Sequence, residues 1–325
     1  MMCQGGQVGF GPAVADRPIV VVGDVINDII VRPLGAVATD SDTPARIEPH
    51  PGGSAANVAS WLGHLGAPVR FFGRVGAGDV ASHRAAFADV GVDARLMVDD
   101  HRPTGTIVVL LDDQGGRSMF TDRGANAAFR ASDVPSGAVE SAAVLHVSGY
   151  ALVEPEARGA VLALVERATA ADVPVSTDPN SAAFIADVGI ATFRALIAGA
   201  DVVVPNLEEG RLLTGRTDPY DVVSSLAATH RVVAMTLGAD GVLVTGPGEA
   251  ATHLPAVPAA SIDPTGAGDA FCAGFLHAYR TTGNAVGAAR EGVAVAAEAV
   301  ATMGARPLRV PEPVSPAPSN RGEQR

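Results

Sequence analysis

A loop near the C-terminal end of the chain combines small residues with a single carboxylate. Its sequence, SIDPTGAGDAF, spans residues 261–271 and precedes an apolar run with helical spacing. Gly266 and Gly268 allow backbone N–H groups to approach an anion, and a helix N-terminus adds partial positive charge. Asp269 beside such a site can accept a proton from an attacking hydroxyl. The alternative is an ordinary loop whose aspartate caps the helix, but the length of the pattern favours phosphoryl transfer.

The basic residues are all arginines: the chain has 23 of them and no lysine. Schiff-base aldolases, pyridoxal-phosphate enzymes, nucleotide hydrolases with a GK[ST] loop and protein kinases all need a lysine amine, so these classes are excluded. Arginine is a poor substitute because it keeps its proton. A phosphoryl-transfer site in this chain must therefore rely on backbone N–H groups.

Net charge and the spacing of cysteine, histidine and glycine argue against further classes. The formal net charge of -12 is unsuited to a nucleic-acid binder. With Cys3 and Cys272 as the only cysteines, neither a disulfide framework nor a thiolate metal site is expected. The eight histidines lack a zinc-hydrolase spacing such as H-E-x-x-H. GRVGAGD, residues 73–79, reads G-x-x-G-x-G and thus departs from the dinucleotide-binding pattern.

Strand and helix patterns alternate along most of the chain. Residues 17–31, RPIVVVGDVINDIIV, begin with a β-branched run typical of a strand buried on both faces, and residues 54–66 then have helical spacing. Repetition of this unit predicts an α/β fold in which helices cover both faces of a mostly parallel sheet. Ligands of such sheets bind beyond the carboxyl ends of the strands, where we expect the loop before Asp269.

Two segments interrupt the alternation. Residues 29–50 are extended and punctuated by proline, and residues 104–123 contain two β-rich runs around a DDQGG turn, which indicates a hairpin. Together they predict a small β-sheet lid over the mouth of the main sheet.

One domain at residues 17–310 accounts for these patterns. Residues 1–16 are rich in glycine and small residues, residues 311–325 are polar and proline-rich, and both are predicted to be disordered tails. The chain has no apolar run of transmembrane length, and its first residues lack the features of a secretory signal. We expect no contact with a membrane and a cytoplasmic location.

Six motifs occur in an order and spacing that resemble the ribokinase-like sugar kinases, also called the phosphofructokinase-B type. The resemblance covers residues 18–310 and implies a three-layer sandwich with a β lid. The motifs are DPTGAGDAF, GGSAANVASWLGHLG at residues 52–66, GRVGAGD, TGTIVVLLD with GRSMFTDRGAN, PNLEEGRLLTG and TLGADG at residues 236–241.

The resemblance implies roles for individual residues in catalysis and acceptor binding. Asp269 matches the catalytic base that activates a sugar hydroxymethyl oxygen, and the amides of Gly266, Ala267 and Gly268 match the anion hole. The implied sugar-binding residues are Asp28, Gly52, Gly53 and Asn57, together with Asp269 itself.

ATP, Mg²⁺ and a monovalent cation such as K⁺ are the cofactors that the resemblance implies. Asn206 and Glu209 match residues that organise magnesium and phosphates, largely through water. The implied nucleotide-binding residues are Asp178, Asn206, Thr236, Gly238, Gly241, Gly266 and Gly268. Asp263 and Thr265, with carbonyl groups at residues 300–305, match the monovalent-cation site.

Three positions depart from a ribokinase and leave the sugar open. Ile26 stands where an asparagine is expected, Ser54 replaces a lysine, and Gly149 or Tyr150 occupies the place of a sugar-contacting glutamate. Ribose, fructose or a related small sugar therefore all remain candidates. In this group the lid often pairs with the lid of a second subunit, which would cover its exposed edges, so we expect a homodimer.

Two alternatives remain within the same fold. A nucleoside kinase would need aromatic residues to stack on a base, and the lid offers only Phe120, with Met119 beside it. Arg117 and Arg123 could read a phosphate or carboxylate on the acceptor, but solvated lid charges are the simpler interpretation. A sugar-sensing protein without activity would be expected to lose the base or the anion hole, and this chain retains both.

Overall fold

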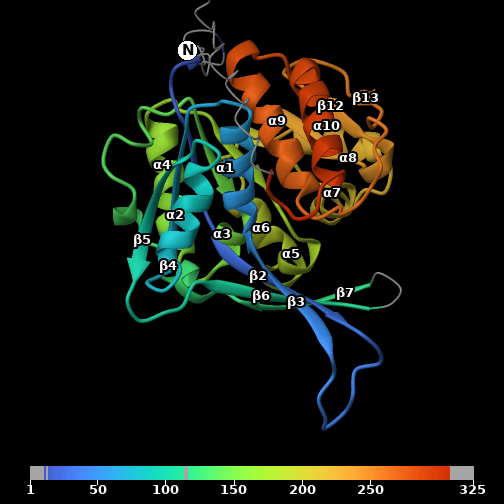
Figure 1. The fold of residues 1–325 in the computed structure, drawn as a ribbon. Coiled ribbons are helices and arrows are strands. Elements are labelled where there is room, and N and C mark those ends of the chain that lie inside the picture. The colour runs from blue at the N-terminus through green and yellow to red at the C-terminus, as the bar shows by residue number, and fades with distance from the viewer. Residues whose placement is uncertain (1–10, 12–13, 113–115, 308–325) are drawn as a thin grey trace, which may run out of the picture.

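Helices cover both faces of a nine-stranded sheet in the computed structural model, which describes residues 11, 14–112 and 116–307 (Figure 1). The strand order is β13-β12-β11-β10-β9-β8-β1-β4-β5; β12 and β13 are antiparallel to their neighbours and the other pairs are parallel. The strands are β1 (Ile19–Val22), β4 (Val69–Gly76), β5 (Asp93–Asp99), β8 (Val144–Ser148), β9 (Val175–Asp178), β10 (Val202–Val203), β11 (Val232–Thr236), β12 (Val242–Thr245) and β13 (Thr252–Leu254).

Two hydrophobic cores form because the central strands alternate their side chains between the sheet faces. Ile19 and Val21 pack with one helix layer, while Val20 and Val22 pack with the other, which explains the continuous apolar run of this strand. The first layer consists of α1 (Ser54–His64), α2 (Val80–Ala88), α9 (Ala267–Thr282) and α10 (Ala285–Val300). The second consists of α3 (Gly149–Val153), α4 (Arg158–Ala170), α5 (Ala182–Val188), α6 (Ile190–Leu196), α7 (Leu207–Thr214) and α8 (Pro219–Ala227).

The predicted lid is confirmed as a separate four-stranded sheet that extends away from the main body (Figure 1). Its order is β3-β2-β6-β7, with β2 parallel to β6 and the outer pairs antiparallel. The strands are β2 (Ile26–Pro33), β3 (Ala45–Gly52), β6 (Gly105–Leu111) and β7 (Arg117–Asp122). Only residues 23–25 separate β1 from β2, so the lid is joined directly to the carboxyl end of a central strand of the main sheet.

The two faces of the lid differ in what they meet. One face, with Asp28, Ile107 and Met119 among its residues, lines a cavity against the main body. The opposite face carries a second set of alternating positions, of which Ile47 is 63% and Phe120 is 62% exposed. The apolar residues at these outer positions are Ile29, Val31, Ile47, Val108, Leu110 and Phe120.

Short elements account for most of the difference between the expected and observed folds. Strands β11 and β12 form an antiparallel pair, and β5, α3, α5, α8 and β13 were not expected from the sequence. Most of the predicted tails, residues 1–10, 12–13 and 311–325, lies outside the described residues, as do residues 308–310 of the predicted domain. Within the described part of the chain, no helix has the length and apolar character needed to cross a bilayer.

Candidate active site

The loop before α9 places backbone N–H groups around an open space. Gly266 is the N-cap of α9 with φ 76°, a left-handed conformation that glycine adopts readily. A Cβ atom there would lie 2.7 Å from the Cα atom of Ala305, so side chains are also excluded by contact. The N–H groups of Gly268 and Asp269 lie in the first helical turn and have no carbonyl acceptor within the helix. This end of α9 is therefore suited to an anion.

Two side chains of α1 hold the carboxylate of Asp269. Ser54 Oγ donates to Oδ1 at 2.7 Å, and Asn57 Nδ2 donates to Oδ2 at 2.9 Å. Burial raises the pKa of Asp269 to about 8; the negative charges of Asp178 and Asp24 also raise it, whereas the two hydrogen bonds lower it. A carboxyl group with this pKa is a stronger base than an exposed aspartate and is partly ionised at neutral pH.

Three cavities meet at the N-terminus of α9. The central cavity has a volume of about 220 Å³, a second of about 780 Å³ lies under the lid, and a third of about 580 Å³ lies against α10. The central cavity shares Gly266 and Asp269 with the lid cavity, and Ala267 and Gly268 with the third. Ligands in the two outer cavities would thus meet at the anion-binding end of the helix.

The lid cavity is lined by the residues predicted to bind an acceptor, except Gly52. Asp28 on β2 lines its wall together with Gly53 and Asn57 of the segment that opens α1. A Cβ atom on Gly52 would lie 1.9 Å from Asp28 Oδ2, so only glycine permits this approach between the two lid strands. Burial raises the pKa of Asp28 to about 6, an effect that the nearby positive charge of Arg306 opposes. The cavity therefore offers a carboxylate that can accept hydrogen bonds from hydroxyl groups.

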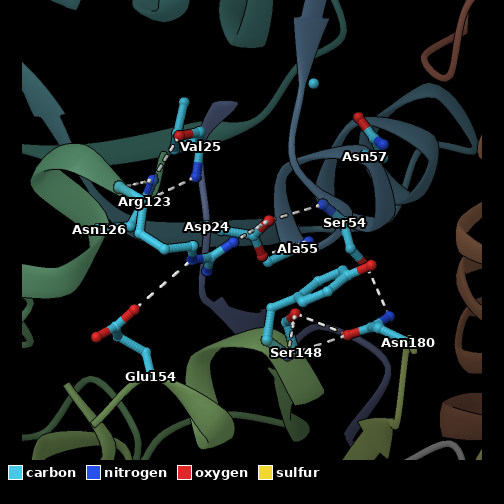
Figure 2. Close-up of polar contacts among 12 residues, drawn as sticks. Asp24, Val25, Ser54, Ala55, Asn57, Arg123, Asn126, Ser148, Glu154 and Asn180 are labelled. Carbon is cyan, nitrogen blue, oxygen red and sulfur yellow. Dashed lines mark hydrogen bonds and ion pairs between the residues drawn. The ribbon is translucent and has the colours of Figure 1, made fainter. Parts of the chain in front are cut away.

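Figure 2 shows a polar network behind this cavity that joins the lid to the main sheet. The buried carboxylate of Asp24 accepts the backbone N–H groups of Ser54 and Ala55 at 3.1 and 3.4 Å. Arg123 forms two ion pairs: its Nη1 lies 3.9 Å from Asp24 Oδ2, and its Nε lies 3.8 Å from Glu154 Oε2 (Figure 2). Since only 18% of the Arg123 side chain is exposed, the interpretation of this residue as a solvated lid charge is wrong.

The central cavity brings together three residues predicted to bind nucleotide or magnesium. It is lined by Asp178 at the end of β9 and by Asn206 and Glu209 at the start of α7. Asn206 and Glu209 form a reciprocal capping box: Asn206 N–H donates to Glu209 Oε2, and Glu209 N–H donates to Asn206 Oδ1, both at 2.9 Å. Burial raises the pKa of Glu209 to about 7 and that of Asp178 well above its usual range, with the charge of Glu209 adding to the latter.

The cavity against α10 is mainly apolar. Thr236, at the end of β11, lines both it and the central cavity, and Gly238 and Gly241 of the following turn form one wall. The remaining walls include Val257, Phe271, Val293 and Val300. A flat apolar ring attached to a polar chain would fit this combination of an apolar wall and an adjoining anion site.

Asp263 connects the loop before α9 to the segment after α10. Its Oδ1 accepts the N–H of Thr265 at 3.0 Å, and its Oδ2 accepts the N–H of Gly304 at 3.1 Å. Partial burial alone would raise the pKa of Asp263, but these hydrogen bonds hold it below its ordinary value. From the lid, Arg117 Nη1 donates to Thr265 Oγ1 at 2.9 Å, which links the lid to the same loop.

A sequence pattern described as pfkB family carbohydrate kinase matches residues 16–312. The chain belongs to this family. It is a carbohydrate kinase and hence a phosphotransferase, as the motif order and the loop before α9 predicted.

Relatives of the kinase cover most of its length. It is 32% identical over 273 residues to a fructokinase from Escherichia coli, a match that spans 81% of this chain and 84% of that protein. A fructokinase double mutant from Vibrio cholerae O395, solved with fructose, ADP and potassium, is 28% identical with a TM-score of 0.76 and covers 90% and 94% of the two chains. An adenosine kinase from Sinorhizobium meliloti shares the fold at 24% identity, with a TM-score of 0.80 and coverage of 90% and 97%.

Several residues of the site were not expected from the sequence. Asp24 and Asn180 follow β1 and β9, so the rule that ligands bind beyond the carboxyl ends of strands could have indicated both. Arg306 could not be expected from the sequence, because it follows no strand and its partner is far away in the chain. Its Nε donates to Oδ1 of Asn57, 249 residues away, at 3.2 Å.

The aromatic residues that line the lid cavity also differ from those expected. Phe120 pairs with Val108 on the outer face of the lid, and the cavity is lined instead by Tyr150 and Phe184. The rings of Tyr150 and Phe184 meet edge to face with centroids 5.5 Å apart. Only Met119 of the expected lid pair reaches the cavity.

Proposed function

We propose that this carbohydrate kinase transfers the γ-phosphoryl group of ATP to the hydroxymethyl oxygen of a small sugar. The observation that carries the proposal is the meeting of two outer cavities at one helix N-terminus, with Asp269 on the acceptor side. The apolar cavity against α10 suits the adenine base, and the lid cavity suits the sugar. The transferring group would occupy the central cavity.

The reaction follows from what each group can do. The acceptor hydroxyl gives its proton to Asp269 as its oxygen forms a bond to the γ-phosphorus, and the bond from that phosphorus to the bridging oxygen breaks to release ADP. Of the predicted donors Gly266, Ala267 and Gly268, the N–H of Ala267 already donates to the Pro264 carbonyl at 3.3 Å. The N–H of Gly268, with that of Asp269 and the dipole of α9, is proposed to stabilise the negative charge of the group in transit. In a chain without lysine, these backbone donors take the place of a cationic side chain.

Asp178, Asn206 and Glu209 are the residues proposed to hold Mg²⁺. The fit rests on two neighbouring carboxylates whose pKa values are raised by burial, since a bound cation would stabilise the ionised form of both. The ion, when bound, neutralises charge on the phosphates. Asp263 and Thr265 are proposed for a monovalent cation such as K⁺, because Asp263 stays ionised beside the anion-binding loop.

The acceptor is proposed to be a furanose or hexose, with ribose and fructose as the first candidates. Asp28 faces a cavity that also contains Asn57 and Asp269, which gives several acceptors and donors for vicinal hydroxyl groups. The similarity to fructokinases supports this acceptor class.

A nucleoside is the second candidate for the acceptor, because of the size of the lid cavity and the aromatic residues that line it. The volume of about 780 Å³ leaves room beyond a monosaccharide, and Tyr150 and Phe184 present aromatic surface on which a base could stack.

The assembly is proposed to be a cytoplasmic homodimer through the lid. The outer lid face carries six apolar residues, including the exposed Ile47 and Phe120, and a second copy of the same face would bury them. This arrangement would also cover the edge strands β3 and β7.

ADP release in the presence of MgATP and K⁺ tests the proposal. The acceptor panel contains ribose, fructose, 2-keto-3-deoxygluconate, fructose 1-phosphate, adenosine, inosine and pseudouridine. We expect turnover on a sugar. Turnover restricted to nucleosides would keep the mechanism and replace the acceptor class, whereas ATP binding without turnover on any acceptor would favour a sensor.

A further inference from the structure

A chain of hydrogen bonds runs from the ends of two sheet strands to the carboxylate of Asp269. Ser148 Oγ at the end of β8 donates to Asn180 Oδ1 at 2.8 Å (Figure 2). The backbone N–H of Tyr150 donates to the same oxygen at 3.4 Å. Asn180 Nδ2 donates to Ser54 Oγ at 2.8 Å, and Ser54 Oγ donates to Asp269 Oδ1 at 2.7 Å. The chain therefore links β8, β9, α1 and α9.

The far end of this chain favours one direction for its bonds. The backbone N–H of Tyr150 can only donate and is shared between Ser148 Oγ at 3.3 Å and Asn180 Oδ1 at 3.4 Å. With Ser148 Oγ also donating to Asn180 Oδ1, the amide oxygen faces these two donors and the NH₂ group faces Ser54. Ser54 Oγ accepts that bond and has a single proton left, which goes to Asp269. If the amide of Asn180 were turned over, its NH₂ group would face the Tyr150 N–H, and Ser54 Oγ would lose the hydrogen bond that it accepts.

The backbone of Asn180 keeps the amide in place. This residue has φ 69°, in the left-handed region that asparagine tolerates better than most residues. Its N–H donates to Asp178 Oδ1 at 2.9 Å, which anchors the residue to the end of β9. Both the main chain and the side chain of Asn180 are thus hydrogen-bonded, and reorientation of the amide would disturb its bonds to Ser148 and Ser54.

We infer that Ser54 and Asn180 are positioning residues that shift Asp269 toward its unprotonated, proton-accepting form, against the effect of its surroundings. A hydroxyl group constrained to donate stabilises the carboxylate and has no equivalent interaction with the carboxylic acid. The inference rests on the proposed role of Asp269 as the base. It assigns a function to Ser54, which replaces the expected lysine, and to Asn180, for which no role was expected.

The charged groups around Asp269 make such a device necessary. Asp24 after β1 and Asp178 on β9 face it with negative charge, and both disfavour its ionisation. Arg306, behind Asn57, provides positive charge on the other side. Two further titratable neighbours, Tyr150 on α3 and Cys272 on α9, have pKa values that burial raises, so they are neutral at pH 7. Asp28 and Arg123 line the same lid cavity as Asp269.

The test is the pH profile of kcat/KM, measured on whichever acceptor the wild type uses. In Ser54→Ala the donor is removed, and in Asn180→Asp the new carboxylate takes the Ser54 proton for itself. We expect the acidic limb of the profile to move upward, so that each variant loses about tenfold at pH 7 for a shift of about one pH unit and recovers above about pH 9.5.

Matched variants separate this effect from structural damage. Ser60→Ala removes a buried hydroxyl group of α1 that donates to the Ala56 carbonyl. Asn284→Asp changes the exposed N-cap residue of α10. Both variants should keep the wild-type pH profile. Ser54→Thr retains the hydroxyl and should restore the profile.

The outcomes separate two kinds of failure. A wild type that turns over no acceptor would contradict the proposed function. An active wild type whose Ser54→Ala and Asn180→Asp variants keep the acidic limb, or lose the same factor at every pH, would overturn the positioning role alone. If Ser54→Ala fails to fold, Asn180→Asp and Ser54→Thr decide by the same criterion.

Discussion

Asp269 stands in an environment that favours its protonated form, and this has a consequence for stability. Burial and the two nearby aspartates raise its pKa to about 8 in the folded protein, whereas an unfolded chain has the ordinary value near 3.8. Between these two pH values the folded state binds more protons, so this group lowers the free energy of unfolding as pH rises toward 8.

Asp269→Asn should therefore become more stable relative to the wild type as pH increases. The expected gain is up to about 1.4 kcal/mol per pH unit between about pH 4.5 and about pH 8, on top of a constant offset from the altered hydrogen bonds. Urea denaturation of both proteins at four pH values measures it. A difference that does not change with pH would show that Asp269 ionises normally in the folded state.

Sequence reasoning reached some of these residues and could not reach others. Asp269 and Gly266 lie in one contiguous motif whose spacing has a direct physical meaning. Asn180 and Arg306 act through partners 126 and 249 residues away, and only the packed fold brings them together. Arg123 was noticed but misjudged, because its burial depends on Asp24 and Glu154 from other elements.

At the scale of elements, the start of α9 makes two neighbouring glycines behave differently. Gly266 needs a positive φ and touches Ala305, whereas a Cβ atom on Gly268 meets nothing within 4 Å and would project into the cavities. Gly266→Ala should lower the free energy of unfolding by at least about 1 kcal/mol.

Gly268→Val should leave stability almost unchanged and weaken ATP binding, because the new side chain would occupy the anion-binding space. Thermal melts with and without MgATP measure both quantities, and each variant is the control for the other. Equal nucleotide affinity in Gly268→Val and the wild type would argue against a phosphate at this position.

Long periodic elements were predictable, and short ones were not. Helices α9 and α10 each have 16 residues with a clear apolar pattern, and the lid hairpin carries its own turn signal. Helix α5 and strand β13 have seven and three residues, too few for a period to be recognised. They form because neighbouring elements bury them, which is information that local sequence lacks.

At the scale of the whole molecule, the proposed dimer through the lid would link acceptor binding to assembly. Its inner face lines the acceptor cavity and its outer face carries the apolar residues, so dimerisation would stiffen the wall of the site. Phe120→Asp, on the outer face, should convert the dimer into a monomer and raise the acceptor KM more than it lowers kcat. Sedimentation equilibrium measures the mass, with Tyr220→Asp, exposed on α8, as the control. A wild type that is already monomeric would refute the proposed interface.

The most direct test of the account is single-turnover phosphoryl transfer by Asp269→Asn, with ATP binding measured in parallel. The amide introduced by this substitution cannot accept the acceptor proton, and the nucleotide cavities are otherwise unchanged. We predict that ATP affinity stays within about threefold of the wild type while transfer falls by at least about 100-fold, as expected for a lost general base. Transfer at near wild-type rate would contradict the assignment of Asp269 as the base and, with it, the proposed mechanism.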